Sequence, residues 1–263
     1  MKYSLLLTIV LFLAVVVLSN EVDDLRGIGE RFHWETSFGN AGAKGQPVWG
    51  ASVPLYKEYP DARRVSLNTS LVSDMPLAQA IAERKSTRQF SDKSVTIPEL
   101  TKILLSANGL TNQTHGYAHR TTPSAGALYP IDLYVAVHSV EGLDSGLYHF
   151  QVIDTTLALI ESGDLGEQMQ EAANDQSAVG NSPVTVVIAA HFDRVTKKYA
   201  DRGYRYAYME AGAVMQNVYL QATALGLGTV SVGAFNDDLL NELLGINGVH
   251  EAGLVIMPIG WPR

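Results

Sequence analysis

The sequence of 263 residues contains no cysteine. This absence excludes disulfide bridges, cysteine-ligated zinc, iron–sulfur clusters, a thiolate nucleophile and a lipid-modified cysteine anchor. Any redox chemistry must therefore be carried by a bound cofactor. The sequence also lacks a Gly-x-Ser-x-Gly nucleophile elbow, a Walker phosphate-binding loop, internal repeats and low-complexity tracts.

The sequence has fewer positively than negatively charged residues, with 19 lysines and arginines and 27 aspartates and glutamates. The formal net charge of −8 argues against nucleic acid as a partner, since its phosphates are also negative. An anionic ligand must instead be held by a local cluster of cations. A hydrophobic content of 46% and a charged content of 17% are typical of a globular protein with a sizeable core.

Long apolar runs are absent except for residues 5–18, which follow Lys2 and end at Ser19. A basic start, an apolar stretch of this length and a small residue at its end are typical of a secretory signal. An uncleaved anchor and a buried core helix are the alternatives, although the run is shorter than the roughly 20 residues that span a bilayer. We predict a secreted or extracytoplasmic protein, with residues 1–19 as a signal peptide or residues 3–18 as a membrane anchor.

The order of the elements predicts an α+β fold, because helices and strands are mixed without a regular βαβ repeat. We expect an irregular lead-in over residues 20–75, rich in glycine and proline, and one folded domain over residues 76–263. A capping box at Thr96 and Glu99 marks one helix start. The expected helices cover residues 74–84, 97–108, 204–225 and 237–244, the first capped by Asp74 and the last by Asn236, and the expected strands cover residues 131–140, 147–152, 184–190, 229–234 and 253–259.

The stretch ERKSTRQFS, residues 83–91, places two guanidiniums and a hydroxyl at alternate positions. In an extended segment Arg84, Ser86 and Arg88 would lie on one side over about 13 Å. Arginine forks and a hydroxyl suit a phosphate dianion. The alternative is a solvated helix end, with the two arginines one turn apart.

Three further segments follow in order, and they are TPSAGALYP at residues 122–130, LGLGTVSVGAF at 225–235 and MPIGWPR at 257–263. Together with the first segment they resemble the nitroreductase-like flavoenzymes, and within them the SagB/ThcOx-type branch that includes azoline dehydrogenases. The resemblance covers residues 76–263. It implies a nitroreductase-like α+β fold with a central mixed sheet flanked by helices, a long buried central helix, and a homodimer with FMN at its interface.

The resemblance also implies roles for particular residues. Arg84, Ser86 and Arg88 would grip the phosphate and ribityl chain of FMN. Against the flavin ring, from the other subunit, would lie Pro123, Ser124, Ala125 and Gly126. The backbone would approach the flavin at Gly228, Thr229 and Gly233. Arg263 would be a further cation on the phosphate. Taken alone, the same segments are also compatible with an ordinary turn, a helix cap and a frayed chain end.

A lysine–tyrosine pair of azoline dehydrogenases has its match in Lys198 and Tyr199. The resemblance implies that tyrosine serves as acid or base beside the lysine charge while the flavin accepts a hydride. The alternatives for this basic, aromatic stretch are a solvated loop with a helix start, or a nucleic-acid platform. His115 and His119 are four residues apart, but Gly116 between them argues against the helix that a metal site with this spacing needs, so no metal site is predicted. His149 is expected to be a packed residue.

These features predict an FMN-dependent oxidoreductase that passes electrons by a ping-pong mechanism from a small-molecule donor to a small-molecule acceptor. We expect no nucleic-acid partner, and contact with a membrane only through the N-terminal segment. Two alternatives stay open: a flavin-binding accessory protein without turnover, and a binding module of the same fold without cofactor.

Overall fold

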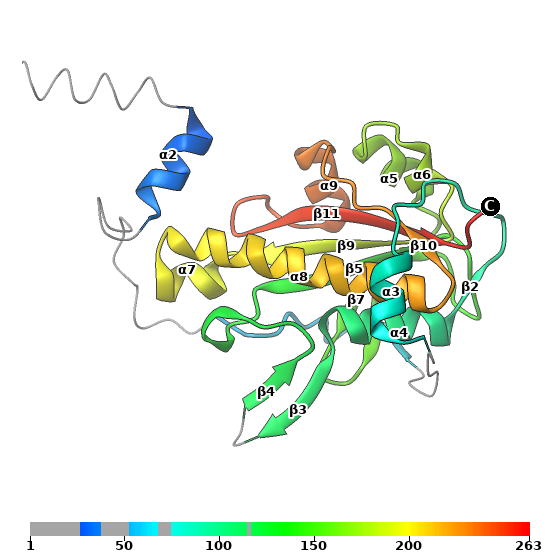
Figure 1. Ribbon diagram of the computed structural model, residues 1–263, viewed down its shortest axis with the longest axis horizontal. Coiled ribbons are helices and arrows are strands. Elements are labelled where there is room, and N and C mark those ends of the chain that lie inside the picture. Colours follow the sequence, from blue (N-terminus) through cyan, green and yellow to red (C-terminus); the bar gives the residue numbers. More distant parts are fainter. Residues whose placement is uncertain (1–26, 38–52, 68–74, 115–116) are drawn as a thin grey trace, which may run out of the picture.

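The structure is a computed structural model that describes residues 27–37, 53–67, 75–114 and 117–263. A seven-stranded sheet runs through its centre, and every neighbouring strand pair in it is antiparallel (Figure 1). In spatial order its strands are β1 (Arg64–Ser66), β8 (Thr156–Ser162), β7 (Gly146–Gln151), β5 (Ile131–Val137), β9 (Val184–His191), β11 (Glu251–Gly260) and β10 (Gly228–Thr229). The predicted α+β class is confirmed, whereas the expected mixed sheet is antiparallel.

Two small sheets accompany the central one. Strands β2 (Val95–Thr96) and β6 (Val140–Glu141) pair in parallel, and β3 (Leu110–Thr114) and β4 (Tyr117–Arg120) form a hairpin. The helices are α2 (Ile28–Glu35), α3 (Leu77–Glu83), α4 (Ile97–Asn108), α5 (Gly166–Ala172), α6 (Ser177–Gly180), α7 (Asp193–Tyr199), α8 (Arg202–Ala224) and α9 (Asp237–Leu244), with a 3₁₀ turn at Ala125–Ala127.

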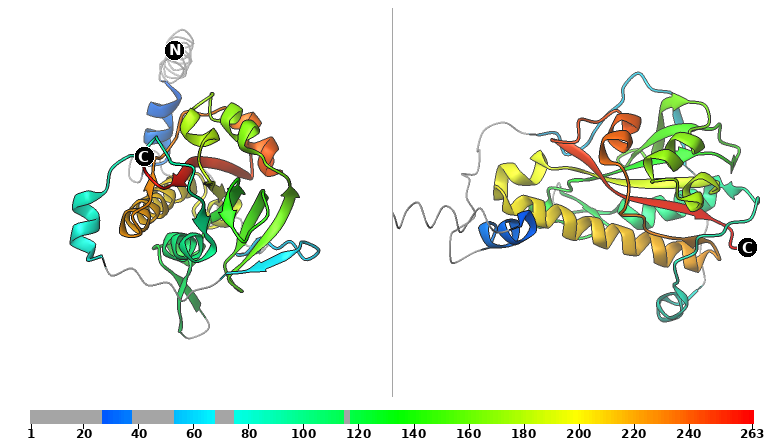
Figure 2. Two further views of the ribbon diagram at one scale, coloured as in Figure 1. Left: turned by 90° about the vertical axis from the view of Figure 1, so that its right-hand side faces the viewer. Right: turned by 90° about the horizontal axis from the view of Figure 1, so that it is seen from above.

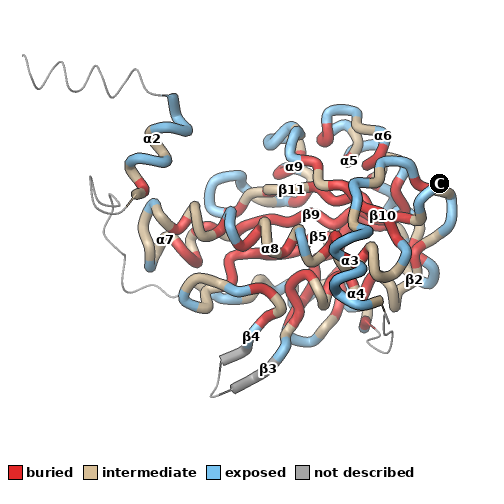
Figure 3. Tube along the Cα trace, viewed as in Figure 1, coloured by how far each residue is buried: buried red, intermediate tan, exposed pale blue. Residues whose placement is uncertain are grey.

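Helices cover both faces of the sheet (Figure 2). One face packs on α4 and α8, and the other on α5, α6 and α9. Strand β9 is buried on both faces, because its residues alternate between the two apolar clusters. Figure 3 shows that the central strands are largely buried and α3 is largely exposed, and within α3 only Ala80 is buried.

Several local predictions are confirmed by the structure. Thr96 and Glu99 form the capping box of α4, with the Glu99 carboxylate accepting the Thr96 N–H at 2.8 Å. The Asn236 side chain accepts the Leu239 N–H and caps α9. The long helix is α8, which at 23 residues extends over about 34 Å.

Other predictions need correction. Of the expected strand over residues 229–234, only Thr229 lies in β10 and Val232 forms an isolated bridge with Ile256, while the Ser231 N–H between them is donated to a tyrosine on α8. The lead-in segment contains α2 and β1. Residues 1–19 and the cap at Asp74 lie outside the described residues. Among the helices that are described, none is both long and apolar enough to cross a bilayer.

Candidate functional site

The predicted phosphate-binding segment begins where α3 ends. At Arg84 the backbone leaves the helix, with φ −53° and ψ 124°. Thr87 donates its N–H to the Thr229 carbonyl at 2.9 Å, and Ser86 is bridged to Thr229 as a parallel neighbour. Arg84 and Arg88 therefore do not share a helical turn, and the extended interpretation is the correct one.

Tyr219 on α8 joins this segment to the chain after β10. Its hydroxyl oxygen lies 3.1 Å from the Ser86 hydroxyl and accepts the Ser231 N–H at 2.7 Å. The Arg84 guanidinium lies over the tyrosine ring, 5.1 Å from its centre. Burial alone would raise the pKa of Tyr219, but the hydrogen bonds from Ser231 and Ser86 and the charge of Arg84 outweigh it and lower that pKa.

Gly228 allows this close approach. A β-carbon at Gly228 would come within 2.6 Å of the Thr87 side chain, so a larger residue would force the two segments apart. Thr229 is buried and donates its hydroxyl to the Pro258 carbonyl at 2.8 Å, which holds it on β11. Gly233 is exposed, and no atom lies within 4 Å of the position of its β-carbon.

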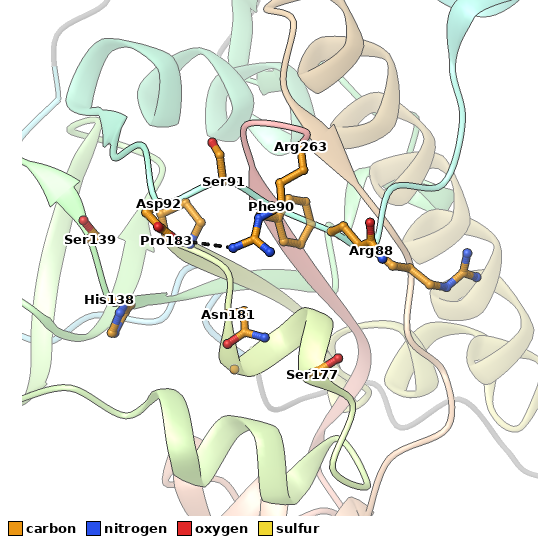
Figure 4. A pocket seen from close by; sticks show the side chains of 12 residues that line it. Arg88, Phe90, Ser91, Asp92, His138, Ser139, Ser177, Asn181, Pro183 and Arg263 are labelled. Carbon is orange, nitrogen blue, oxygen red and sulfur yellow. Dashed lines mark ion pairs between the residues drawn. The ribbon is translucent and has the colours of Figure 1, made fainter.

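Arg88 and Arg263 point away from each other (Figure 4). Arg263 lies 3.7 Å from the Asp92 carboxylate, beside a polar cavity of about 610 Å³. Its N–H is donated to the Gln89 carbonyl at 3.2 Å, so the chain end is paired with the segment after Arg88. Among the described residues no acceptor contacts the Arg88 guanidinium, which is exposed. Arg88 and Arg263 both line that cavity, whereas Ser86 is bridged to Thr229 and Arg84 lies over the Tyr219 ring.

The second group of predicted residues lies near the other end of α8. Gly126 has a left-handed φ of 64°, and a β-carbon there would lie 2.6 Å from the Tyr199 hydroxyl and 2.7 Å from Lys198 Nζ. Tyr199 ends α7 and packs edge-on against Tyr206, with ring centres 4.9 Å apart. The loop that holds Pro123, Ser124, Ala125 and Gly126 thus contacts the lysine–tyrosine pair within one chain.

A buried charged cluster supports this loop. Arg194 pairs with Asp132 at 2.9 Å, and both side chains are at least nine-tenths buried. Burial alone would raise the pKa of Asp132, but Arg194 outweighs it and the pKa is lowered. Burial lowers the pKa of Arg120, whose guanidinium donates to the Ile131 carbonyl. Burial raises the pKa of Glu210 to about 7, against the opposing effects of Ser124, Arg120 and Arg194.

Sequence reasoning missed several of these residues. Arg194 belongs to the basic stretch for which a solvated loop with a helix start was one alternative, yet it is only 3% exposed. Tyr219 and Glu210 occupy the long helix with no local pattern that distinguishes them from packing positions. His149 is buried and hydrogen-bonded to Gln151, as expected. No group of metal-binding side chains occurs within the part of the chain that the structure describes.

Comparison with known proteins identifies the family. A family model described as "Nitroreductase family" matches residues 81–261. The chain belongs to the nitroreductase family. A Methanocaldococcus jannaschii protein named as a nitroreductase, MJ1384, is 40% identical over 189 residues, which are 72% of this chain and 92% of the relative. The predicted membership is confirmed.

More distant relatives support the predicted SagB-type branch of the family. The Microcin B17-processing protein McbC of Escherichia coli is 26% identical over 65% of this chain, which spans 64% of that protein's length. The E. coli microcin synthetase McbBCD complex contains a chain of similar fold, with 24% identity, a TM-score of 0.63, and coverage of 90% of this chain and 92% of that one. A solved nitroreductase-named structure from Ralstonia eutropha has 28% identity and a TM-score of 0.66, over 83% of this chain and 98% of that one.

Proposed function

We propose that this nitroreductase-family oxidoreductase uses FMN and transfers electrons in a ping-pong reaction between two small molecules. The observation that carries the proposal is the pairing of the Arg84–Arg88 segment with Thr229. It leaves the Arg88 guanidinium available to a ligand, beside Arg84 and the Ser86 hydroxyl. Two guanidiniums and a hydroxyl can neutralise and orient a phosphate dianion. The donor set therefore fits the phosphate end of FMN.

We further propose that the complete site forms between two copies of the chain. The Arg84–Arg88 group lies beside Tyr219, whereas the Ser124–Gly126 loop lies beside Glu210, roughly 13 Å earlier along α8 at 1.5 Å per residue. Apolar side chains are exposed near both groups, including Tyr208 and Met209 on α8 and Leu77 and Ile81 on α3. A two-fold pairing that covers these side chains would bring the two groups together from different subunits.

In this proposal the bound flavin supplies the hydride chemistry, and the protein binds, orients and moves protons. Arg84 and Arg88 hold the phosphate. The backbone around Ala125 and Gly126 approaches a flat ring closely because the side chains are small. Tyr199 exchanges a proton with the substrate, and the nearby Lys198 charge stabilises the phenolate form. The Lys198 Nζ lies 5.4 Å from the Tyr199 ring centre, which is compatible with that pairing.

The location of the protein and its partners are also proposals. The apolar run over residues 5–18 supports export, with the N-terminal segment either removed or kept as an anchor. A small-molecule donor and acceptor, such as a quinone or a nitro compound, would then be met outside the cytoplasm. Nothing in the acidic composition favours nucleic acid.

A spectrum of the purified full chain tests the proposal. We expect a yellow protein that releases FMN on denaturation and, after reduction with dithionite, is reoxidised by quinones or nitro compounds. Protein that is colourless and does not bind added FMN would overturn the cofactor assignment. Bound FMN without any reoxidation by an acceptor would support the accessory alternative instead.

A further inference from the structure

The loop of residues 123–129 is held in a backbone conformation that its side chains do not favour. Gly126, Ala127 and Tyr129 have φ angles of 64°, 55° and 45°. Glycine adopts this left-handed region readily, but alanine and tyrosine do so only where surrounding contacts hold them there. Ser124 accepts the Ala127 N–H on its carbonyl at 3.1 Å and the Tyr129 N–H on its hydroxyl at 2.8 Å. These bonds close the loop on itself, and contacts from other elements fix where it lies.

A short stretch of the lead-in, residues 54–57, lies beside the end of this loop and forms what we call the strap. Lys57 fixes the strap to the central sheet, because its Nζ donates to the Tyr134 hydroxyl on β5 and to the Glu251 carboxylate on β11, both at 2.6 Å. The strap precedes residue 81, where the match to the family model begins. Membership of the family therefore predicts no role for it.

Arg194 on α7 connects the strap to the loop by hydrogen bonds. Its Nε donates to the Pro54 carbonyl at 3.0 Å, and its Nη1 donates to the Tyr129 carbonyl at 3.2 Å. The remaining nitrogen, Nη2, lies 2.9 Å from the Asp132 carboxylate, and both charged side chains are buried. A planar guanidinium holds several acceptors in a fixed geometry, which a single ammonium group on a flexible chain does not do. One rigid group thus sets the position of the loop relative to the strap.

Arg120 on β4 makes a second connection between the same two segments. The central carbon of its guanidinium lies 5.5 Å from the centre of the Tyr56 ring on the strap and 4.8 Å from the centre of the Tyr129 ring in the loop. Both distances are within about 6 Å, the range in which a cation is attracted to the face of an aromatic ring. Because Arg120 is only 7% exposed, water does little to weaken this attraction.

We propose that the strap positions the loop of residues 123–129, with Arg194 and Arg120 as the positioning residues that connect the two. Arg194 lies in the first turn of α7, and the same helix ends in the lysine–tyrosine pair that the loop contacts at Gly126. Helix α7 therefore meets the loop at two points, and the strap fixes one of them. The effect on flavin and substrate rests on the proposed function, whereas the hold on the loop is a property of the chain alone.

Hydrogen exchange of the Ala127 and Tyr129 amides in the FMN-free full chain tests the connection. Tyr56→Leu removes the ring beside Arg120 but keeps an apolar side chain. Protection of both amides should fall roughly 5- to 30-fold, the effect of losing one cation–π contact away from water. Tyr56→Phe is the matched control, because it keeps the ring and should keep the wild-type protection. Amides of β9 serve as the internal reference, since a misfolded variant would lose protection there too.

Arg194→Lys gives a second, independent test. Lysine keeps a positive charge beside Asp132, so no buried carboxylate is left unpaired, but one ammonium group cannot replace the fork that reaches both carbonyls. Protection of the Ala127 and Tyr129 amides should fall in this variant as well. Arg63→Lys changes an exposed arginine in the same way and should behave as the wild type.

The FMN-loaded protein provides a second measurement. A loosened loop should slow substrate oxidation several-fold and alter the visible absorption bands of bound FMN, while the affinity for FMN stays nearly unchanged because the proposed phosphate contacts lie elsewhere. Wild-type protection of the loop amides in Tyr56→Leu or in Arg194→Lys overturns the inference, as does equal loss in Tyr56→Phe and Tyr56→Leu. Absence of FMN binding by the wild type would overturn only the proposed function, because the exchange is measured without the cofactor.

Discussion

Gly126 and Tyr199 lie so close that any side chain at Gly126 would displace the tyrosine. A β-carbon on Gly126 would come within 2.6 Å of the Tyr199 hydroxyl oxygen, and at 2.7 Å from Lys198 Nζ it would displace the lysine too. Two segments that are far apart in the sequence thus form one surface, and the absence of a side chain at a single glycine is what permits it.

Gly126→Ala should therefore impair the lysine–tyrosine pair. We expect slower substrate oxidation with FMN still bound, together with a loss of about 1–2 kcal/mol of stability from the left-handed φ. Stopped-flow reduction and denaturant unfolding measure the two effects. Gly245→Ala is the matched control, since Gly245 has a φ of 66° and no atom within 4 Å of its β-carbon position. Equal slowing in both variants would show that strain, and not the contact, is responsible.

Arg88→Ala should weaken FMN binding. Loss of one charge-assisted contact costs about 1.5–3 kcal/mol, or roughly a 10- to 150-fold rise in Kd. Fluorescence titration of apoprotein with FMN measures it. Lys85→Ala removes an equal charge from a neighbouring exposed residue and should leave Kd nearly unchanged. Similar affinities for both variants would remove Arg88 from the phosphate site.

Mixing two impaired variants, at an FMN concentration that does not saturate Arg88→Ala, tests whether the site is shared between subunits. Arg88→Ala chains and Lys198→Ala chains each lack one part of every site. If those parts come from different subunits, each mixed dimer regains one intact site, and activity should recover after the two proteins are unfolded and refolded together. Refolding each variant separately is the control. Failure of the mixture to recover activity, with mixed dimers verified by mass spectrometry, would place both residues in a single-chain site.

Tyr219→Phe should loosen the chain after β10. The Ser231 N–H would lose its acceptor, at a cost of about 1–3 kcal/mol in unfolding free energy, and the Ser86 hydroxyl would lose a partner. Tyr204→Phe on the same helix is the control, because its hydroxyl makes no hydrogen bond among the described residues. Comparable stability of the two variants in urea would mean that the Tyr219 hydroxyl contributes little.

The free energy of unfolding should depend on pH because of the titration of Glu210. Folding raises the pKa of Glu210 from 4.5 to about 7, because burial disfavours the charged form. The folded state then binds the proton more tightly than the unfolded state, so this contribution is complete below pH 4.5 and is lost as the pH rises to about 7. At 1.36 kcal/mol per pKa unit the loss is at most about 3 kcal/mol. Ionisation of Glu210 thus lowers global stability, because a buried carboxylate has lost its contact with water.

Unfolding titrations at pH 5 and pH 7.5 measure this loss as the difference between wild type and Glu210→Gln. The difference should fall by about 2–3 kcal/mol over that range, since glutamine does not titrate. Asp132 has the opposite sign, because its lowered pKa adds stability that disappears only at acidic pH. A constant difference between the two proteins would indicate that Glu210 has an ordinary pKa.

The sequence alone determined the features that depend on a few neighbouring residues. Local hydrogen bonds determine the capping box of Thr96 and Glu99 and the Asn236 cap. A continuous run of β-branched residues determines the buried strand β9. The order of four motifs was enough to identify the family, because each motif is a short contiguous stretch. The extended conformation after α3 was one of two alternatives that the local pattern left open, and the structure decided between them.

Tertiary structure alone decided which distant residues meet and which charges are buried. Arg120, Arg194, Asp132 and Glu210 come from four elements, and no local pattern shows that they share one interior cluster. The direction of Arg263 away from Arg88 depends on how the chain end pairs with the segment after Phe90. Burial and direction are set by the packing of elements far apart in the sequence, so residue type and spacing could not reveal them.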